Sequence, residues 1–342
     1  MLREVWPFVG RKRAAGQPVV LLRLVGRDGP GARPLGATMA VAADGDWTGS
    51  VAGGCVEGML LDEARAVLAG DGPRVIELRI GAELLPWEPG PACRSTLRIL
   101  VTPAPDGPVA ERVTAALGAD LPLRVGVELR HPYRWTTGPG PDRAGESVED
   151  LAGRPVLIIV GGTDLAAVLA ALAVPLGRRV VVVDPRPEYA RAGRVPLADE
   201  VVCAWPDAWL GEHPPSPRDA VLVLTHDPRI DDRALQAALP GPAGHVAVLG
   251  SRETHRERLS RLAGTPGLDR LAGPAGLDLG AGSTVETALS LLAEVVAVAN
   301  ARFGGRLSAT SGPIRAGLRE DHPAPSEDQP GPVNDPTLSP VN

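Results

Sequence analysis

The clearest pattern of apolar positions lies in the middle of the chain, between residues 156 and 184. Two short β-branched runs, at 156–160 and 180–183, flank an Ala/Leu-rich stretch from 165 to about 176. Short apolar runs separated by a helix-length segment are typical of buried parallel strands joined by a crossover helix. The pattern therefore predicts a βαβ unit.

Apolar runs after residue 184 extend this pattern towards the C-terminus. Strands are expected at 200–203, 220–224 and 245–249, and helices at 232–239, after 252 and at 284–301. Alternating strands and helices indicate a Rossmann-like parallel-sheet domain, which we place at 154–315. The segment 316–342 is Pro-rich, acidic and poor in apolar residues, which predicts a disordered tail.

The N-terminal part of the chain has shorter, alternating runs that lie close together. Strands are expected at 19–25, 38–42, 47–51, 74–80, 96–101 and 123–129, and helices at 2–14, 56–68 and 109–117. Asp44-Gly45 is a hairpin signal between the second and third strands. These runs predict an α+β domain at 1–130, followed by a Pro/Gly-rich linker at 131–153. The predicted fold class is α/β, with an N-terminal α+β domain and a C-terminal Rossmann-like domain.

Composition narrows the class of protein. The chain has 342 residues and a net charge of −6, and it lacks the basic stripe expected of a nucleic-acid-binding protein. No run approaches the ~18 apolar residues of a membrane span, and the N-terminal residues do not resemble a signal peptide. Three cysteines are too few for a disulfide framework, so we expect a cytoplasmic protein.

The turn after the first strand of the βαβ unit is one candidate binding site. Gly161 and Gly162 lie at the turn, and Asp184 ends the second strand, which matches the outline of a dinucleotide-binding unit. The full pattern would have glycine at Thr163, and Asp164 adds a negative charge where phosphates would bind. Asp164 is able to cap the helix in place of a phosphate. Two interpretations stay open, a dinucleotide site or a Rossmann-like turn that binds no dinucleotide.

A second candidate site is the strand-to-helix junction Gly53-Gly54-Cys55-Val56-Glu57. N–H groups at the start of a helix lower the pKa of a thiol, so Cys55 would serve as a nucleophile, a soft-metal ligand or a sulfur acceptor. Glu57 would steady the helix or accept a proton. The alternative is a small buried cysteine in a glycine turn, because cysteine is among the most buried residue types.

The other two cysteines differ in their setting. Cys93 precedes a strand, and it would share a ligand with Cys55 if the two thiols meet. Two cysteines alone do not specify a zinc site. Cys203 ends a predicted core strand, so we expect it to be structural.

Two loops follow predicted strands at the edge where doubly wound sheets bind ligands. In the first loop, His226 is a candidate acid/base. Two interpretations are open for Asp227, Asp231 and Asp232, which would either hold a cation or begin the next helix.

The second of these loops is Gly250-Ser251-Arg252. Ser251 is able to cap the following helix, and Arg252 offers a fork for an anion. An anion site and a plain helix cap both remain open.

Taken in order, these motifs resemble the XdhC/CoxI family of xanthine dehydrogenase accessory factors. The resemblance covers about residues 1–315 and includes Asp184-Pro-Arg-Pro-Glu188, residues 276–281, 288–296 and 311–314. Each motif is weak alone, but the ordered set is specific. The chain departs from the family pattern at Thr163-Asp164, where the family has a loop like GAGHVA, and at Arg94-Ser95, where it has Gly-Gly.

The resemblance implies a non-catalytic chaperone for molybdenum cofactor (molybdopterin). Such a protein holds the cofactor transiently while a cysteine desulfurase adds the sulfido ligand, and then passes it to an apo molybdenum hydroxylase. The resemblance places Cys55 and Cys93 near the cofactor, with Cys55 contacting molybdenum and Gly53 and Gly54 alongside. It is also compatible with a homodimer. Thiolate ligation suits molybdenum, and a pterin phosphate suits a helix N-terminus.

An NAD(P)-dependent oxidoreductase is the alternative, with Asp184 on the ribose and His226 as proton donor. Thr163-Asp164 disfavours NAD(P) as the cofactor. A divergent paralogue with an altered ligand is also open, and a further interpretation is a degenerate scaffold that only docks a partner protein.

Overall fold

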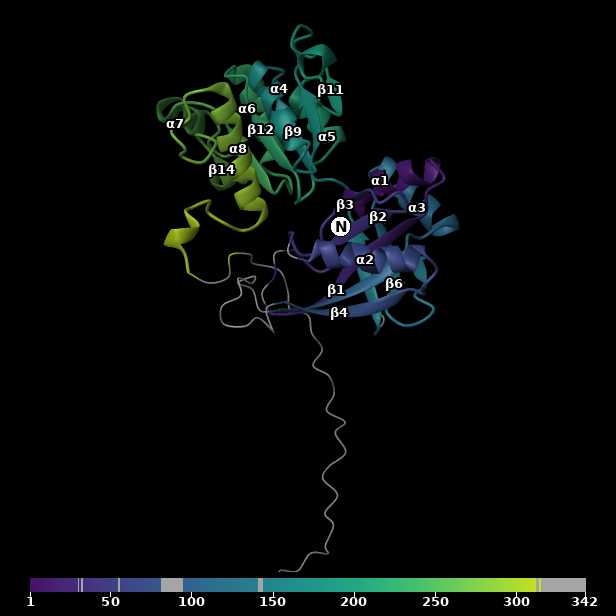
Figure 1. Ribbon diagram of the computed structural model, residues 1–342. Helices are drawn as coiled ribbons and strands as arrows, with labels where there is room; N and C mark the ends of the chain where they lie inside the picture. The colour runs from purple at the N-terminus through teal and green to yellow at the C-terminus, as the bar shows by residue number, and fades with distance from the viewer. Residues whose placement is uncertain are drawn as a thin grey trace, which may run out of the picture. The chain divides into compact units, whose positions relative to one another are not determined.

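The computed structural model describes residues 1–29, 31, 33–54, 56–80, 95–140, 144–311 and 314 (Figure 1). Cys55, Cys93, Arg94 and the expected tail at 316–342 lie outside these residues. The predicted fold class is confirmed, because an antiparallel N-terminal sheet is followed by a parallel C-terminal sheet. Across the described ranges, no helix is both long and apolar enough to span a membrane.

The first sheet has five antiparallel strands in the order β3-β2-β1-β5-β4. They are β1 (Val19–Asp28), β2 (Thr38–Ala42), β3 (Trp47–Gly49), β4 (Arg74–Ile80) and β5 (Ser95–Pro103). Successive side chains of a strand point to opposite faces. Val20 and Leu22 of β1 therefore pack with helix α2 (Glu57–Leu68), while Val19 and Leu21 pack with helix α1 (Leu2–Ala14).

A second, three-stranded antiparallel sheet replaces the expected linker. After α3 (Gly107–Gly118), the strands β6 (Leu123–Glu128), β7 (Trp135–Thr137) and β8 (Glu146–Leu151) pair in the order β7-β6-β8. The linker prediction for 131–153 was wrong over β7 and β8. Their segment is rich in turn residues, and β8 directs the charged side chain of Glu149 into the interior, so no apolar alternation marks it.

The C-terminal part contains a parallel sheet in the order β11-β10-β9-β12-β13-β14. The strands are β9 (Val156–Val160), β10 (Arg179–Val183), β11 (Glu200–Val202), β12 (Ala220–Val223), β13 (His245–Val248) and β14 (Leu271–Ala272). The strand order reverses between β9 and β12, which is the switch point where doubly wound sheets bind ligands.

Helices pack on both faces of this parallel sheet (Figure 1). Helices α4 (Asp164–Ala173) and α8 (Thr284–Ala299) contribute to one core cluster, and α5 (Pro206–Glu212) and α6 (Pro228–Ala238) to the other. Helix α7 (Arg252–Arg261) lies between β13 and β14 in the chain. Helix α6 begins four residues earlier than expected, because Pro228 fits the first helical position. Cys203 is exposed beside the edge strand β11, so the prediction of a core position was wrong.

Candidate functional site

Three of the predicted loops meet at the carboxyl edge of the parallel sheet. Strands β9, β12 and β13 are neighbours, and their last residues, Val160, Val223 and Val248, are in register. The loops that begin at Gly161, Thr225 and Leu249 therefore emerge side by side. A Cβ atom on Gly161 would lie 2.9 Å from Cγ2 of Thr225, so the first two loops pack tightly.

Asp184 holds the glycine turn from inside the protein. Its side chain is 0% exposed, and its carboxylate accepts hydrogen bonds from Gly162 N–H at 2.9 Å and from Arg186, through the backbone N–H at 3.0 Å and the guanidinium at 2.7 Å. The Arg186 guanidinium lies 3.8 Å from the centroid of the Tyr189 ring. These contacts engage both carboxylate oxygens, and they disfavour the ribose-binding role of Asp184 in the oxidoreductase alternative.

The same contacts set the charge of Asp184. Burial raises the pKa of this carboxyl group, but hydrogen bonds from Arg186 and Gly162 lower the pKa by a larger amount. The pKa therefore lies below its usual value. The carboxylate is therefore ionised at neutral pH and fixes the turn as an anion.

The residues after the glycines differ in role from the prediction. Thr163, not Asp164, is the N-cap of α4, and the Asp164 carboxylate pairs with Arg194 at 2.8 Å. Arg194 also donates to Gly162 O at 3.1 Å, so it clamps the turn from outside. The Thr163 hydroxyl is buried and has no hydrogen-bond partner within the described part of the chain. The turn therefore retains an unused polar group.

A buried network connects the second and third loops. Thr225 donates its hydroxyl to Asp231 at 2.5 Å, and Arg258 donates to Asp231 at 3.3 Å and to Leu249 O at 3.1 Å. Burial raises the pKa of Asp231, although Thr225 and Arg258 oppose the shift. Arg258 is 2% exposed, and its Nε and Nη1 find no partner among the described residues. A Cβ on Gly250 would lie 3.4 Å from this Nη1, so unused donors lie under the third loop.

The sequence did not identify Arg186 or Arg258 as site residues. Arg258 belongs to a helix with charges on all sides, so no periodicity distinguishes its buried position. The predicted cation site is also not formed. Asp231 binds Arg258, Asp232 pairs with Arg261 at 2.7 Å, and no cluster of three His, Cys, Asp or Glu side chains suits a metal ion in the region described.

Helix capping accounts for two of the predicted contacts. Asp227 caps α6 by accepting from Arg229 N–H at 3.0 Å, and Ser251 caps α7 by accepting from Thr254 N–H at 3.0 Å. His226 is exposed and has a left-handed φ of +59°. Arg252 is exposed at the start of α7. His226 and Arg252 are thus exposed predicted side chains of these loops that do not serve as helix caps.

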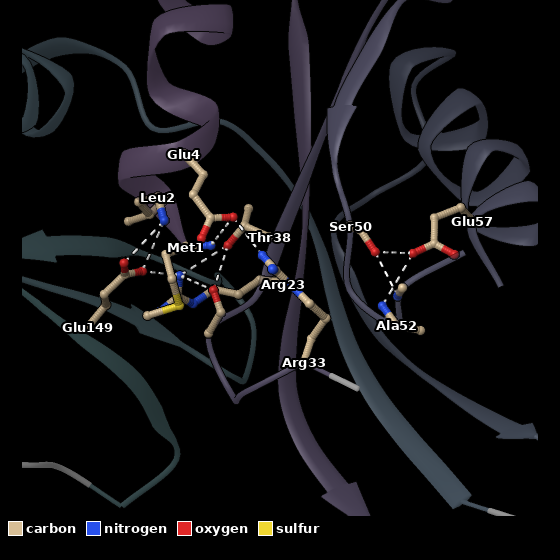
Figure 2. Close-up of polar contacts among 12 residues, drawn as sticks. Met1, Leu2, Glu4, Arg23, Arg33, Thr38, Ser50, Ala52, Glu57 and Glu149 are labelled. Atoms are coloured by element: carbon tan, nitrogen blue, oxygen red, sulfur yellow. Dashed lines mark hydrogen bonds and ion pairs between the residues drawn. The ribbon is translucent and has the colours of Figure 1, made fainter. Parts of the chain in front are cut away.

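Glu57 organises the loop that contains the predicted thiol (Figure 2). Its buried carboxylate accepts from the Ser50 hydroxyl at 2.5 Å, from Ala52 N–H at 3.3 Å and from Val56 N–H at 3.1 Å. Ser50 in turn accepts from Gly53 N–H at 2.7 Å. Burial raises the pKa of Glu57, but these hydrogen bonds outweigh it, and the pKa lies below its usual value. Glu57 is therefore an ionised clamp for the loop.

The glycines of this loop meet a backbone requirement. Gly53 and Gly54 have φ values of +89° and +110°, which other residues adopt only with strain. Cys55, between Gly54 and Val56, and Cys93 lie outside the described residues, so their predicted role rests on the sequence.

We expect Glu57→Ala to lower the free energy of unfolding by about 1–3 kcal/mol, because it leaves three donors of the loop without their acceptor. Urea unfolding followed by circular dichroism measures the change. Glu63→Ala on the same helix is the matched control. Glu63 pairs with Arg74 through partly exposed side chains, so its loss is worth about 0–1 kcal/mol. Equal losses in both variants would contradict the clamp.

Comparison with protein families finds two matches, one in each part of the chain. A model described as the XdhC and CoxI family matches residues 12–81, and a model described as the XdhC Rossmann domain matches residues 157–295. The first covers β1 to β4 of the antiparallel sheet, and the second covers the parallel sheet with its carboxyl-edge loops.

The individual proteins to which the chain is similar carry names that are consistent with these family matches. The chain is 29% identical to the molybdenum cofactor insertion chaperone PaoD of Escherichia coli (strain K12) over 272 residues, 76% of each chain. It is 28% identical to a probable xanthine dehydrogenase subunit of Bacillus subtilis (strain 168) over 149 residues, 44% of each chain. A crystal structure described as a xanthine dehydrogenase from Bacillus halodurans has the same fold, with a TM-score of 0.74 and 23% identity over 90% of this chain and 98% of that one.

Proposed function

Because the chain belongs to the XdhC/CoxI family, we propose that it binds molybdenum cofactor and delivers it to a molybdenum hydroxylase of the xanthine dehydrogenase type. The similarity to PaoD, a protein named for cofactor insertion, supports this role. The cofactor is cargo, which the protein holds and releases without turning over a substrate. Sulfuration by a cysteine desulfurase during this holding step, and a homodimeric state, are part of the proposal.

The unused donors at the carboxyl edge of the parallel sheet carry the proposal. The buried Thr163 hydroxyl and the Nε and Nη1 groups of Arg258 lack partners among residues that the structure describes. A buried donor without an acceptor is destabilising, and a phosphate offers several acceptor oxygens. In this proposal the phosphate of a pterin cofactor is the acceptor for these donors. The exposed residues His226 and Arg252 lie in loops at the same edge.

The Glu57-clamped loop supplies the second half of the proposed site. Glu57 and Ser50 hold the backbone N–H groups of Ala52, Gly53 and Val56, which lie on both sides of position 55. Thiolates are soft ligands of the kind that molybdenum accepts. In this proposal Cys55 contacts the metal, with Cys93 as the second thiol.

The test is the molybdenum and oxidised-pterin content of the protein, purified from a host that makes the cofactor. We expect near-stoichiometric content in the wild type and a drop of about tenfold or more in Cys55→Ser, because a metal contact is lost. The control is Cys203→Ser, which removes an exposed thiol beside β11 and is expected to retain the cofactor. Equal contents in the two variants would remove Cys55 from the site. A folded wild type without metal or pterin would refute the proposed function.

A further inference from the structure

A cavity of about 330 Å³ lies at the amino edge of the parallel sheet, opposite the glycine turn. Pro155, Asp219 and His245, at the starts of β9, β12 and β13, form one wall. Val295 and Val298, near the end of α8, form an apolar wall. This volume lies at the lower end of the range for small-molecule sites.

A buried arginine with an unpaired donor atom lines this cavity. Arg178 is 6% exposed, and its Nη1 is buried with no hydrogen-bond partner in the described chain. Burial lowers the pKa of Arg178, Asp219 raises it and Arg218 lowers it, with a net shift below the usual value. Burying a charge costs free energy unless the charge is paired. An anion bound in the cavity would pair with the Arg178 guanidinium.

The acidic groups at the cavity are already engaged. Asp219 accepts from Val156 N–H at 2.6 Å and from Ser216 N–H at 2.7 Å. His245 contacts the carboxylate of Glu294 at 3.3 Å. The second arginine of the wall, Arg218, donates to Gly153 O at 3.0 Å. The cavity is thus lined by the guanidinium groups of Arg178 and Arg218 and by the carboxylate of Asp219, which already accepts hydrogen bonds from two backbone N–H groups.

We propose that this cavity binds a small organic anion, a carboxylate or a phosphate monoester with an apolar body. The anionic group pairs with the Arg178 guanidinium. The planar guanidinium binds either a carboxylate or a phosphate through two parallel N–H donors. The apolar body packs against Val295 and Val298. The site is separate from the carboxyl-edge loops of the proposed cofactor site, because parallel strands place their two ends at opposite edges of the sheet.

The test titrates the full-length protein with benzoate, phenyl phosphate and benzyl alcohol by isothermal calorimetry. We expect saturable binding of at least one of the two anions and none of the neutral alcohol. Arg178→Met is expected to weaken anion binding at least tenfold. Val298→Trp, which fills the cavity from a partly exposed position and keeps the arginine, is expected to weaken it similarly. Arg261→Met, on the surface of α7, is the control with unchanged binding.

The outcomes separate this proposal from the proposed function. Preference for benzoate identifies a carboxylate ligand, and preference for phenyl phosphate identifies a phosphate ester. Failure of both anions to bind at millimolar concentration, binding of the alcohol as tight as that of the anions, or wild-type affinity in Arg178→Met and Val298→Trp would overturn the site. The Cys55→Ser variant is expected to bind the anions like the wild type, so loss of the molybdenum cofactor leaves this result unchanged.

Discussion

Replacing Arg23 with methionine is expected to lower the free energy of unfolding by about 3–5 kcal/mol, because it leaves the carboxylate of Glu149 buried without its cation. The two side chains are 1% and 3% exposed, and they meet at 2.6 Å. Arg23 also donates to Thr38 at 3.3 Å, and Glu149 accepts from Leu2 N–H at 3.1 Å (Figure 2). The pair therefore joins β1, β2, β8 and the start of α1.

Urea unfolding of Arg23→Met, followed by circular dichroism, measures this loss. The control is Arg65→Met, which breaks an exposed pair with Asp62 between side chains that are 61% and 78% exposed. Exposed pairs of this kind contribute about 0–1 kcal/mol. A loss in Arg23→Met as small as in the control would show that the buried pair does not support the fold.

We expect Asp184→Asn to lower the free energy of unfolding by about 2–3 kcal/mol at neutral pH. The substitution keeps the shape of the side chain but replaces charged hydrogen bonds to Gly162 and Arg186 with weaker ones. The matched control is Asp164→Asn at the other end of the same turn. The Asp164 carboxylate is exposed, so its loss is expected to change stability by about 0–1 kcal/mol.

The effect of Asp184 is expected to depend on pH. Its pKa in the folded protein lies below its usual value, so the carboxylate stabilises the fold above the unfolded-state pKa of about 3.9. This contribution disappears as the pH falls through the lower, folded-state pKa. Urea midpoints measured at neutral and acidic pH should therefore converge between wild type and Asp184→Asn as the pH falls. A constant difference would contradict the role of the charge.

The parallel sheet and the three-stranded antiparallel sheet differed in how well the sequence predicted their strands. Strands β9 and β10 are buried on both faces, so they appear as continuous apolar runs. Strand β8 was missed because its inward side chain, Glu149, is charged and its partner lies in β1. Helix α5 was missed because it is short and its burial depends on contacts with α6. Local patterns thus predict elements whose burial is apolar, and they miss those buried through distant polar partners.

The candidate site shows the same limit. The sequence placed Gly161 and Gly162 in the turn after β9 and Asp184 at the end of β10, because strand ends and glycines are local signals. It did not predict that Asp184 is held by Arg186, or that Arg258 lies under Gly250. Those relations depend on which charged side chains become buried, and each arginine acquires that position only through tertiary packing.

The Arg23–Glu149 pair also has a consequence for synthesis on the ribosome. The partners are 126 positions apart, so Arg23 emerges long before its carboxylate exists. At about 5–20 residues per second, that interval is roughly 6–25 s. During this time the nascent β1 carries a guanidinium on a side chain that is buried in the final sheet, without the anion that permits its burial. The antiparallel part of the protein therefore completes its interior only after β8 has been made, just before the first strand of the parallel sheet.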